Sequence, residues 1–172
     1  MRPLATVLPK AIKLASASLM LMALWGCSQL NTITSGPLNG KTSISTIKIT
    51  GTTQFVCHRD EQGAFWKFVQ LSGRLTDMSG RVLGQQTNPQ TLVDRQHREA
   101  HLQQVALLNK NNADNLPELL FEIQPNTIPW LKHATYLTRE NTRGGLPLTG
   151  CSPSQKGQIL NVKFSANYRL WK

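Results

Sequence analysis

Near its C-terminal end the chain alternates between apolar and polar side chains over nine residues. The apolar positions are Val162, Phe164, Ala166, Tyr168 and Leu170, and each residue between them is polar or charged. Successive side chains of a β-strand point to opposite faces, so this period of two predicts a half-buried strand or a bent pair of strands. A helix would distribute the same five side chains around its circumference.

Shorter strand patterns recur along the chain, separated by turn signals. Residues 47–49, 54–57, 65–71, 119–123 and 130–137 are candidate strands. Residues 77–80 (Asp-Met-Ser-Gly) predict a hairpin turn. Residues 91–108 read either as strands or as one helix, and we favour strands. With 172 residues, 40% of them hydrophobic, one domain is expected. We therefore predict an all-β, mainly antiparallel domain, a sandwich or barrel with room for a short helix in the middle.

The N-terminus has the three-part pattern of an export signal. Residues 1–13 carry three cations and no acid, and residues 14–25 are apolar or small. About 12 helical residues rise roughly 18 Å, short of the ~30 Å hydrocarbon core, so a cleaved signal is favoured over a membrane span. The following Leu24-Trp25-Gly26-Cys27 resembles a bacterial lipobox, although Trp25 departs from the small residue usual there. The alternative is an ordinary signal with a chance cysteine.

The lipobox resemblance implies that Cys27 is the lipidated N-terminus of the mature protein. Acyl chains such as palmitate on one cysteine suffice for stable anchoring. Residue 28 is Ser rather than Asp, which in bacterial lipoproteins implies the outer membrane, facing the periplasm. The expected organisation is a signal peptide over residues 1–26, a lipidated N-terminus and tether over 27–42, and one β domain over 43–172.

The charge balance favours anionic surroundings. Lys and Arg number 19 against 9 Asp and Glu, a net charge of +10. Removing Arg2, Lys10 and Lys13 with the signal leaves 16 against 9, or +7. The expected partners are the membrane through the lipid anchor, and envelope glycan or anionic lipid as candidate ligands. No nucleic acid is expected.

Lipidation of Cys27 explains an odd number of cysteines in an exported protein. Cys57 and Cys151 remain, and in an oxidising compartment they are expected to form a disulfide. Two separate buried thiols are the alternative. Without a C-x-x-C motif, neither a redox site nor a cysteine zinc site is supported.

Several segments resemble the DUF3455 family of exported bacterial and fungal proteins, which has no established activity. The most specific is Asn141 to Cys151 followed by the terminal strand, and the resemblance spans residues 51–171. Further matching segments are 54–57, 66–68, 77–80 and 128–131. The two cysteines retained in this context support their pairing. Residues 84–89 and 94–96 depart from the family pattern. Some fungal relatives carry a malate dehydrogenase label, but this chain has no G-x-G-x-x-G motif.

Few groups of residues in the sequence suggest a metal site or a catalytic site. His97 and His101 stand four apart, but Arg98 occupies the position where a zincin needs Glu, so no metal site is predicted. No cofactor and no catalytic residue are predicted either.

The candidate ligand-binding residues are Arg143, Gly144, Gly145, Trp66 and Trp130. The two glycines allow close approach to an anion beside the arginine, and the tryptophans, with Tyr168, would stack on sugars. A tight turn and core packing are the competing interpretations. The predicted function is an outer-membrane lipoprotein that acts as a binding or envelope-structural module. A small periplasmic enzyme with an unidentified active site is the alternative.

Overall fold

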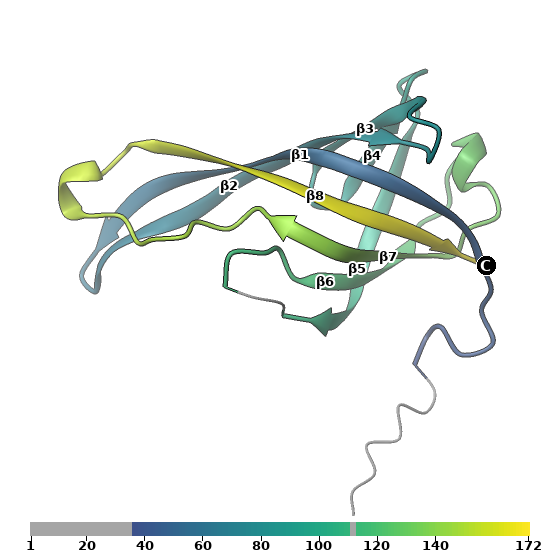
Figure 1. Cartoon of the computed structure of the whole chain (residues 1–172), viewed down its shortest axis with the longest axis horizontal. Helices are drawn as coiled ribbons and strands as arrows, with labels where there is room; N and C mark the ends of the chain where they lie inside the picture. The colour runs from purple at the N-terminus through teal and green to yellow at the C-terminus, as the bar shows by residue number, and fades with distance from the viewer. Residues whose placement is uncertain (1–35, 111–112) are drawn as a thin grey trace, which may run out of the picture. The chain divides into compact units, whose positions relative to one another are not determined.

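The computed structural model describes residues 36–110 and 113–172. Their strands form one closed antiparallel β-barrel in which each strand pairs with its neighbours in sequence and β1 closes on β8 (Figure 1). The strands are β1 (Ser43–Asp60), β2 (Gly63–Thr76), β3 (Val82–Asn88), β4 (Thr91–Asp94), β5 (Glu99–Asn109), β6 (Glu118–Ile123), β7 (Tyr136–Gly144) and β8 (Ile159–Trp171). The predicted all-β antiparallel class is confirmed, in its barrel form.

The terminal strand is the clearest success of the sequence pattern. Its residues Phe164, Ala166, Tyr168 and Leu170 are buried in the barrel interior, while the residues between them are more exposed. The same alternation on β1 places Ile47 and Ile49 in the core. Burying one face of each strand inside a closed wall leaves the other face to solvent.

The structure corrects several local expectations. Residues 54–57 and 65–71 are not separate short strands but parts of β1 and β2. Over residues 91–108 the favoured interpretation is confirmed, because they form β4 and most of β5, and the alternative of a helix is wrong. The only helical segments among the described residues are two 3-10 turns, η1 (Pro129–Leu131) and η2 (Pro153–Gln155). The strand expected over 130–137 therefore begins only at Tyr136, because Pro129 starts a helical turn with its fixed φ.

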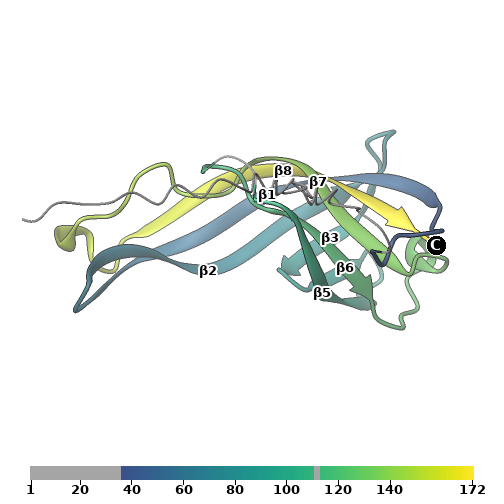
Figure 2. The same ribbon diagram turned by 90° about the horizontal axis from the view of Figure 1, so that it is seen from below.

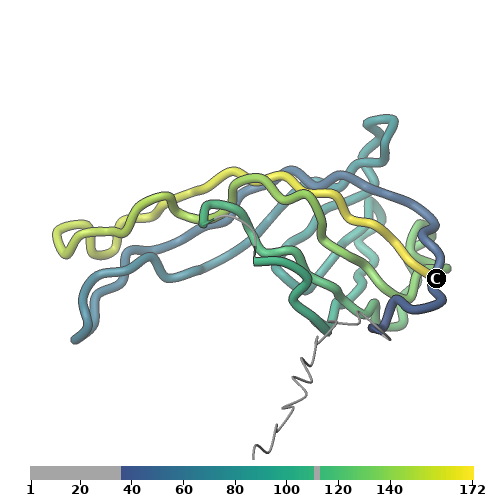
Figure 3. Tube along the Cα trace, turned by 60° about the horizontal axis from the view of Figure 1, so that its bottom comes forward, coloured from purple at the N-terminus to yellow at the C-terminus, as the bar shows by residue number. Residues whose placement is uncertain are grey.

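The β1–β2 hairpin extends well beyond the barrel wall. β2 pairs with β1 along most of its length but with β3 only over Gly73–Thr76. Residues 54–70 of this hairpin and residues 146–160 together form a projection that we call the arm. Figures 1 to 3 show it in three orientations, with the hairpin in blue and the 146–160 segment in yellow-green.

Two facing glycines stand at the base of the arm. Gly51 of β1 lies opposite Gly73 of β2 and Phe164 of β8. A Cβ added to Gly51 would lie 2.0 Å from the Ser72 carbonyl oxygen and 2.9 Å from the Phe164 ring. The backbones approach so closely here that only glycine fits.

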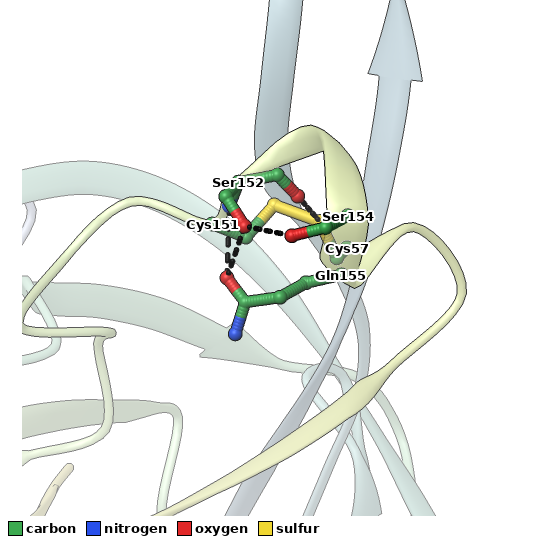
Figure 4. The surroundings of a disulfide bond; sticks show 5 residues. All are labelled: Cys57, Cys151, Ser152, Ser154 and Gln155. Carbon is green, nitrogen blue, oxygen red and sulfur yellow. Dashed lines mark hydrogen bonds between the residues drawn. A yellow bond between two sulfur atoms is a disulfide. The ribbon is translucent and has the colours of Figure 1, made fainter.

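A disulfide fastens the two halves of the arm. Cys57 of β1 and Cys151, between β7 and β8, are bonded with their Cα atoms 6.0 Å apart (Figure 4). Two backbone hydrogen bonds join the same two segments: Cys57 N–H donates to the Gln158 carbonyl, and Gly157 N–H donates to the Cys57 carbonyl. The predicted pairing is confirmed, and the alternative of two separate thiols is wrong.

Candidate basic face

The outward side of β2, β1 and β8 carries positive charge and only one acid, Asp60 at the hairpin tip. By their register, Lys48 of β1, Lys67 and Arg74 of β2 and Lys163 of β8 all point away from the barrel interior. All four side chains are exposed. We call this surface the basic face. Between the cations it presents hydroxyl and amide side chains: Thr50, Thr52, Gln54, Gln70, Ser72, Asn161, Ser165 and Asn167.

The scarcity of acids here follows from the strand sequences. Asp60 at the hairpin tip is the only Asp or Glu in β1, β2 and β8. Arg169 lies on the same outward side of β8, but it forms a salt bridge with Glu140 of the neighbouring strand β7. Its Nη2 is 3.1 Å from a carboxylate oxygen of Glu140. The other four cations have no carboxylate partner among the described residues. Their charge remains available to an external anion.

A groove crosses the basic face beside β3. It has a volume of about 950 Å³. Arg74 and Lys163 line it together with Thr50, Ser72 and Gln85. Arg95 and His97 of the β4–β5 turn also line it. The groove thus combines cationic, hydroxyl and amide groups from four strands and one turn.

Asp94 at the end of β4 also lines this groove, but its carboxylate is paired with Arg98 of the following turn. Asp94 accepts hydrogen bonds from the backbone N–H groups of Gln96 and Arg98 and from the Arg98 guanidinium. Burial opposes ionisation, but the Arg98 backbone and side-chain hydrogen bonds outweigh it and hold the pKa of Asp94 below its usual value. The carboxylate is therefore occupied within its own turn, while Arg95 and His97 remain exposed.

A second groove brings Arg143 to the same face. This groove has a volume of about 840 Å³ and is lined by Lys48, Thr50, Ser165 and Arg143. Glu118 also lines it, and one of its oxygens accepts a hydrogen bond from the backbone N–H of Asn141 at 2.7 Å. Thr50 lines both grooves.

A smaller groove of about 410 Å³ extends the surface toward the arm. Thr52, Gln70 and Ser72 line both this groove and the first. The three grooves therefore form one continuous polar surface over β8, β1 and β2.

The structure separates Arg143 from the two glycines that follow it. Arg143 is exposed and points outward opposite Ser165. Gly144 and Gly145 instead have positive φ angles of 70° and 98°. A Cβ on Gly145 would lie 2.5 Å from the Leu116 side chain, and Thr53 Oγ1 donates a hydrogen bond to the Gly145 carbonyl. The glycines thus form a tightly packed turn, and Arg143 is the member of the trio that faces a groove.

The structure does not bring the predicted aromatic residues together. Trp66 lies on the arm opposite Cys57, whereas Trp130 lies in η1 and packs against the core. Trp130 belongs to the end of the barrel where β1 begins. Thr135, shortly after η1, donates a backbone hydrogen bond to Trp171, and Trp171 lies opposite Ser43 at the start of β1. Cys57, the partner of Trp66, is near the other end of β1, roughly 46 Å from Ser43 along an extended strand. The two tryptophans therefore lie toward opposite ends of the domain.

Tyr168 is enclosed in the barrel rather than exposed to a ligand. Its hydroxyl donates a hydrogen bond to Gln86 Oε1 at 2.5 Å, and burial raises the pKa of the phenol. Gln86 Nε2 in turn donates to the Pro89 carbonyl at 3.0 Å. This buried polar network is a structural feature of the interior.

The two histidines of the sequence pattern do not form a pair. His97 stands in the β4–β5 turn with φ at 61°, and His101 lies on β5. Within residues 36–110 and 113–172, no group of three or more His, Cys, Asp or Glu side chains is arranged to hold a metal ion.

Sequence reasoning missed Arg74 and Lys163 as groove residues. They lie 89 positions apart and meet only because β2 and β8 both pair with β1. The sequence did contain a pattern that could have predicted a cationic surface, since these three strands place cations and hydroxyls at alternating positions with almost no acid.

No protein-family model, curated protein or solved structure matches this chain. Cys27 and the predicted signal segment lie outside the described residues. Among the helices that the structure does describe, none has the length and apolar character needed to cross a membrane.

Proposed function

We propose that the protein is an outer-membrane lipoprotein that faces the periplasm and binds an anionic, hydroxyl-rich ligand on its basic face. The observation that carries this proposal is the cationic outward side of β2, β1 and β8, whose only acid is Asp60 at the hairpin tip, with its connected grooves. The export signal and the Leu24-Trp25-Gly26-Cys27 segment support the location.

The chemistry of the grooves favours binding. Arginine offers a planar set of donors to carboxylate or phosphate, and lysine adds a compact charge. Hydroxyl and amide side chains suit the hydroxyl groups of a sugar or a lipid head group. Envelope glycan and anionic lipid both provide this combination, so the shared recognition element is an anionic group on a polar carrier.

The test removes the two groove cations and compares two sources of anions. Arg74→Gln with Lys163→Gln is measured against peptidoglycan sacculi and against vesicles of phosphatidylglycerol mixed with phosphatidylcholine. All proteins carry Cys27→Ser, so acyl chains contribute to neither measurement. A basic residue near an anionic surface contributes about 1 kcal/mol, so the double variant should bind the true ligand source about 30-fold more weakly.

The matched control is Lys110→Gln with Lys156→Gln, which removes two exposed lysines outside the basic face. It should retain most of the wild-type affinity, and added salt should weaken wild-type binding. Sedimentation with sacculi and flotation with vesicles distinguish the two sources. Equal binding of wild type and groove variant to both materials contradicts the proposal.

A further inference from the structure

One side of β5 has no neighbouring strand over much of its length. β4 pairs with β5 only at Glu99, Ala100 and His101, and Leu102 donates one backbone hydrogen bond to Gln90. Beyond that point β5 pairs with β6 on its other side. No strand among the described residues pairs with the free side of Gln103–Leu108. A row of backbone donors and acceptors is therefore open, and another extended backbone is the partner that matches its spacing.

The open edge is apolar and uncharged. Val105, Leu107 and Leu108 are 43%, 47% and 46% exposed, and no residue from Gln103 to Leu108 is ionisable. The register with β6 shifts at Val105 and again at Leu108, so both are bulged residues that the β5–β6 ladder leaves unmatched. Three large apolar side chains thus border the same unpaired backbone.

The charge distribution favours a second copy of this chain as the occupant. In the closed order of eight strands, β5 stands four positions from β1 in either direction, on the far side from the basic face. Exposed Glu99 and Glu122 lie on β5 and β6. Two copies can approach through β5 with their basic faces directed away from each other, which limits the repulsion between two positively charged molecules.

We propose that the protein forms a twofold-symmetric dimer in which Gln103–Leu108 of two copies pair antiparallel. Self-pairing of this segment sets no like charges opposite each other, whatever its register. It satisfies the open backbone groups and buries Val105, Leu107 and Leu108 of both copies. A twofold contact of this kind is closed and does not propagate into a filament. Such a dimer also presents two basic faces, so a polymeric ligand would bind bivalently.

The test measures the association state of the Cys27→Ser chain by sedimentation velocity over a range of concentrations. We expect a reversible dimer, and Val105→Lys with Leu108→Lys should raise its dissociation constant by about tenfold or more, because four lysines would then meet at the interface. The control is Leu148→Lys, at an 82% exposed apolar residue outside the edge, which should leave the dimer unchanged. A monomeric wild type, or an unchanged dimer in the β5 variant, overturns the proposal.

A second measurement does not depend on how the lysine variant folds. Val105→Cys places one thiol near the proposed twofold axis in each copy, so a short bismaleimide should link two chains efficiently. Leu148→Cys is the more exposed control and should link them less. Equal yields from the two cysteine variants would indicate random collision and would overturn the proposal.

Discussion

Gly145 shows how one residue can look like a ligand contact in the sequence and act as a packing element in the fold. Its φ is 98°, and a Cβ atom on this residue would stand 2.5 Å from the Leu116 side chain, so there is no room for a larger residue. Gly145→Ala should therefore destabilise the domain by about 2 kcal/mol or more, a drop in Tm of roughly 6 °C or more in a thermal melt.

Arg143→Ala provides the contrast at the neighbouring position. Because Arg143 is exposed and lines the second groove, its loss should weaken binding of sacculi or anionic vesicles while Tm stays within about 1 °C. If Arg143→Ala unfolds the domain, or Gly145→Ala melts as the wild type does, these assignments are wrong.

The arm is the element whose stability depends most on a covalent bond. The disulfide joins residues 94 positions apart, and in the chain-entropy model a loop of this size contributes roughly 4 to 5 kcal/mol, as an upper estimate. Reduction, or Cys57→Ser with Cys151→Ser, should lower the free energy of unfolding by up to that amount. The loss should be measurable by urea denaturation.

The arm should also open before the barrel does. Its exposed apolar residues Phe65, Phe68 and Ile159 contrast with the fully buried Ile49, Leu75 and Leu137 of the barrel. Hydrogen exchange after reduction should therefore accelerate first in residues 54–70 and 146–160. Uniform acceleration over the whole domain, or free thiols in the unreduced protein, would contradict this assignment.

The whole molecule combines a proposed membrane anchor with a proposed binding face. Metabolic labelling with a fatty-acid analogue should mark the wild-type chain and not Cys27→Ala, because the proposed acyl chains would attach at that cysteine. Fractionation should place the labelled protein in the outer membrane. Equal labelling of both proteins would show that Leu24-Trp25-Gly26-Cys27 is an ordinary signal end with a chance cysteine.

The folded domain places its two chain ends together at the start of the barrel. Thr42 and Lys172 exchange backbone hydrogen bonds at 3.1 and 3.0 Å. The arm begins where β1 leaves the barrel, so the tip of the hairpin at Asp60 and Gly63 lies at the opposite end of β1 from this junction. If a tether joins the domain to the membrane at Ser43, the arm extends away from the point of attachment.

Features that depend on near neighbours could be predicted from the amino-acid sequence. The alternation from Val162 to Leu170 predicts β8 because it requires only that side chains two residues apart share a face. The turn at Asp77 follows in the same way from local chemistry, since its carboxylate accepts hydrogen bonds from Ser79 and Arg81. The number of cysteines, together with the expectation of an export signal, predicted the disulfide without any knowledge of the fold.

The order of the strands around the barrel could not be predicted in this way. Alternation shows which side chains share a face, but it does not show that β1 pairs with β8 more than 100 residues later or that the wall closes into a barrel. Arg74 and Lys163 therefore share a groove, while Trp66 and Trp130 are separated along the length of the domain. The sequence likewise did not show which strand lies beside β5. Its open edge exists because the neighbouring strand β4 has only four residues. Pairing between distant strands depends on packing and loop closure across the whole chain, which no local pattern encodes.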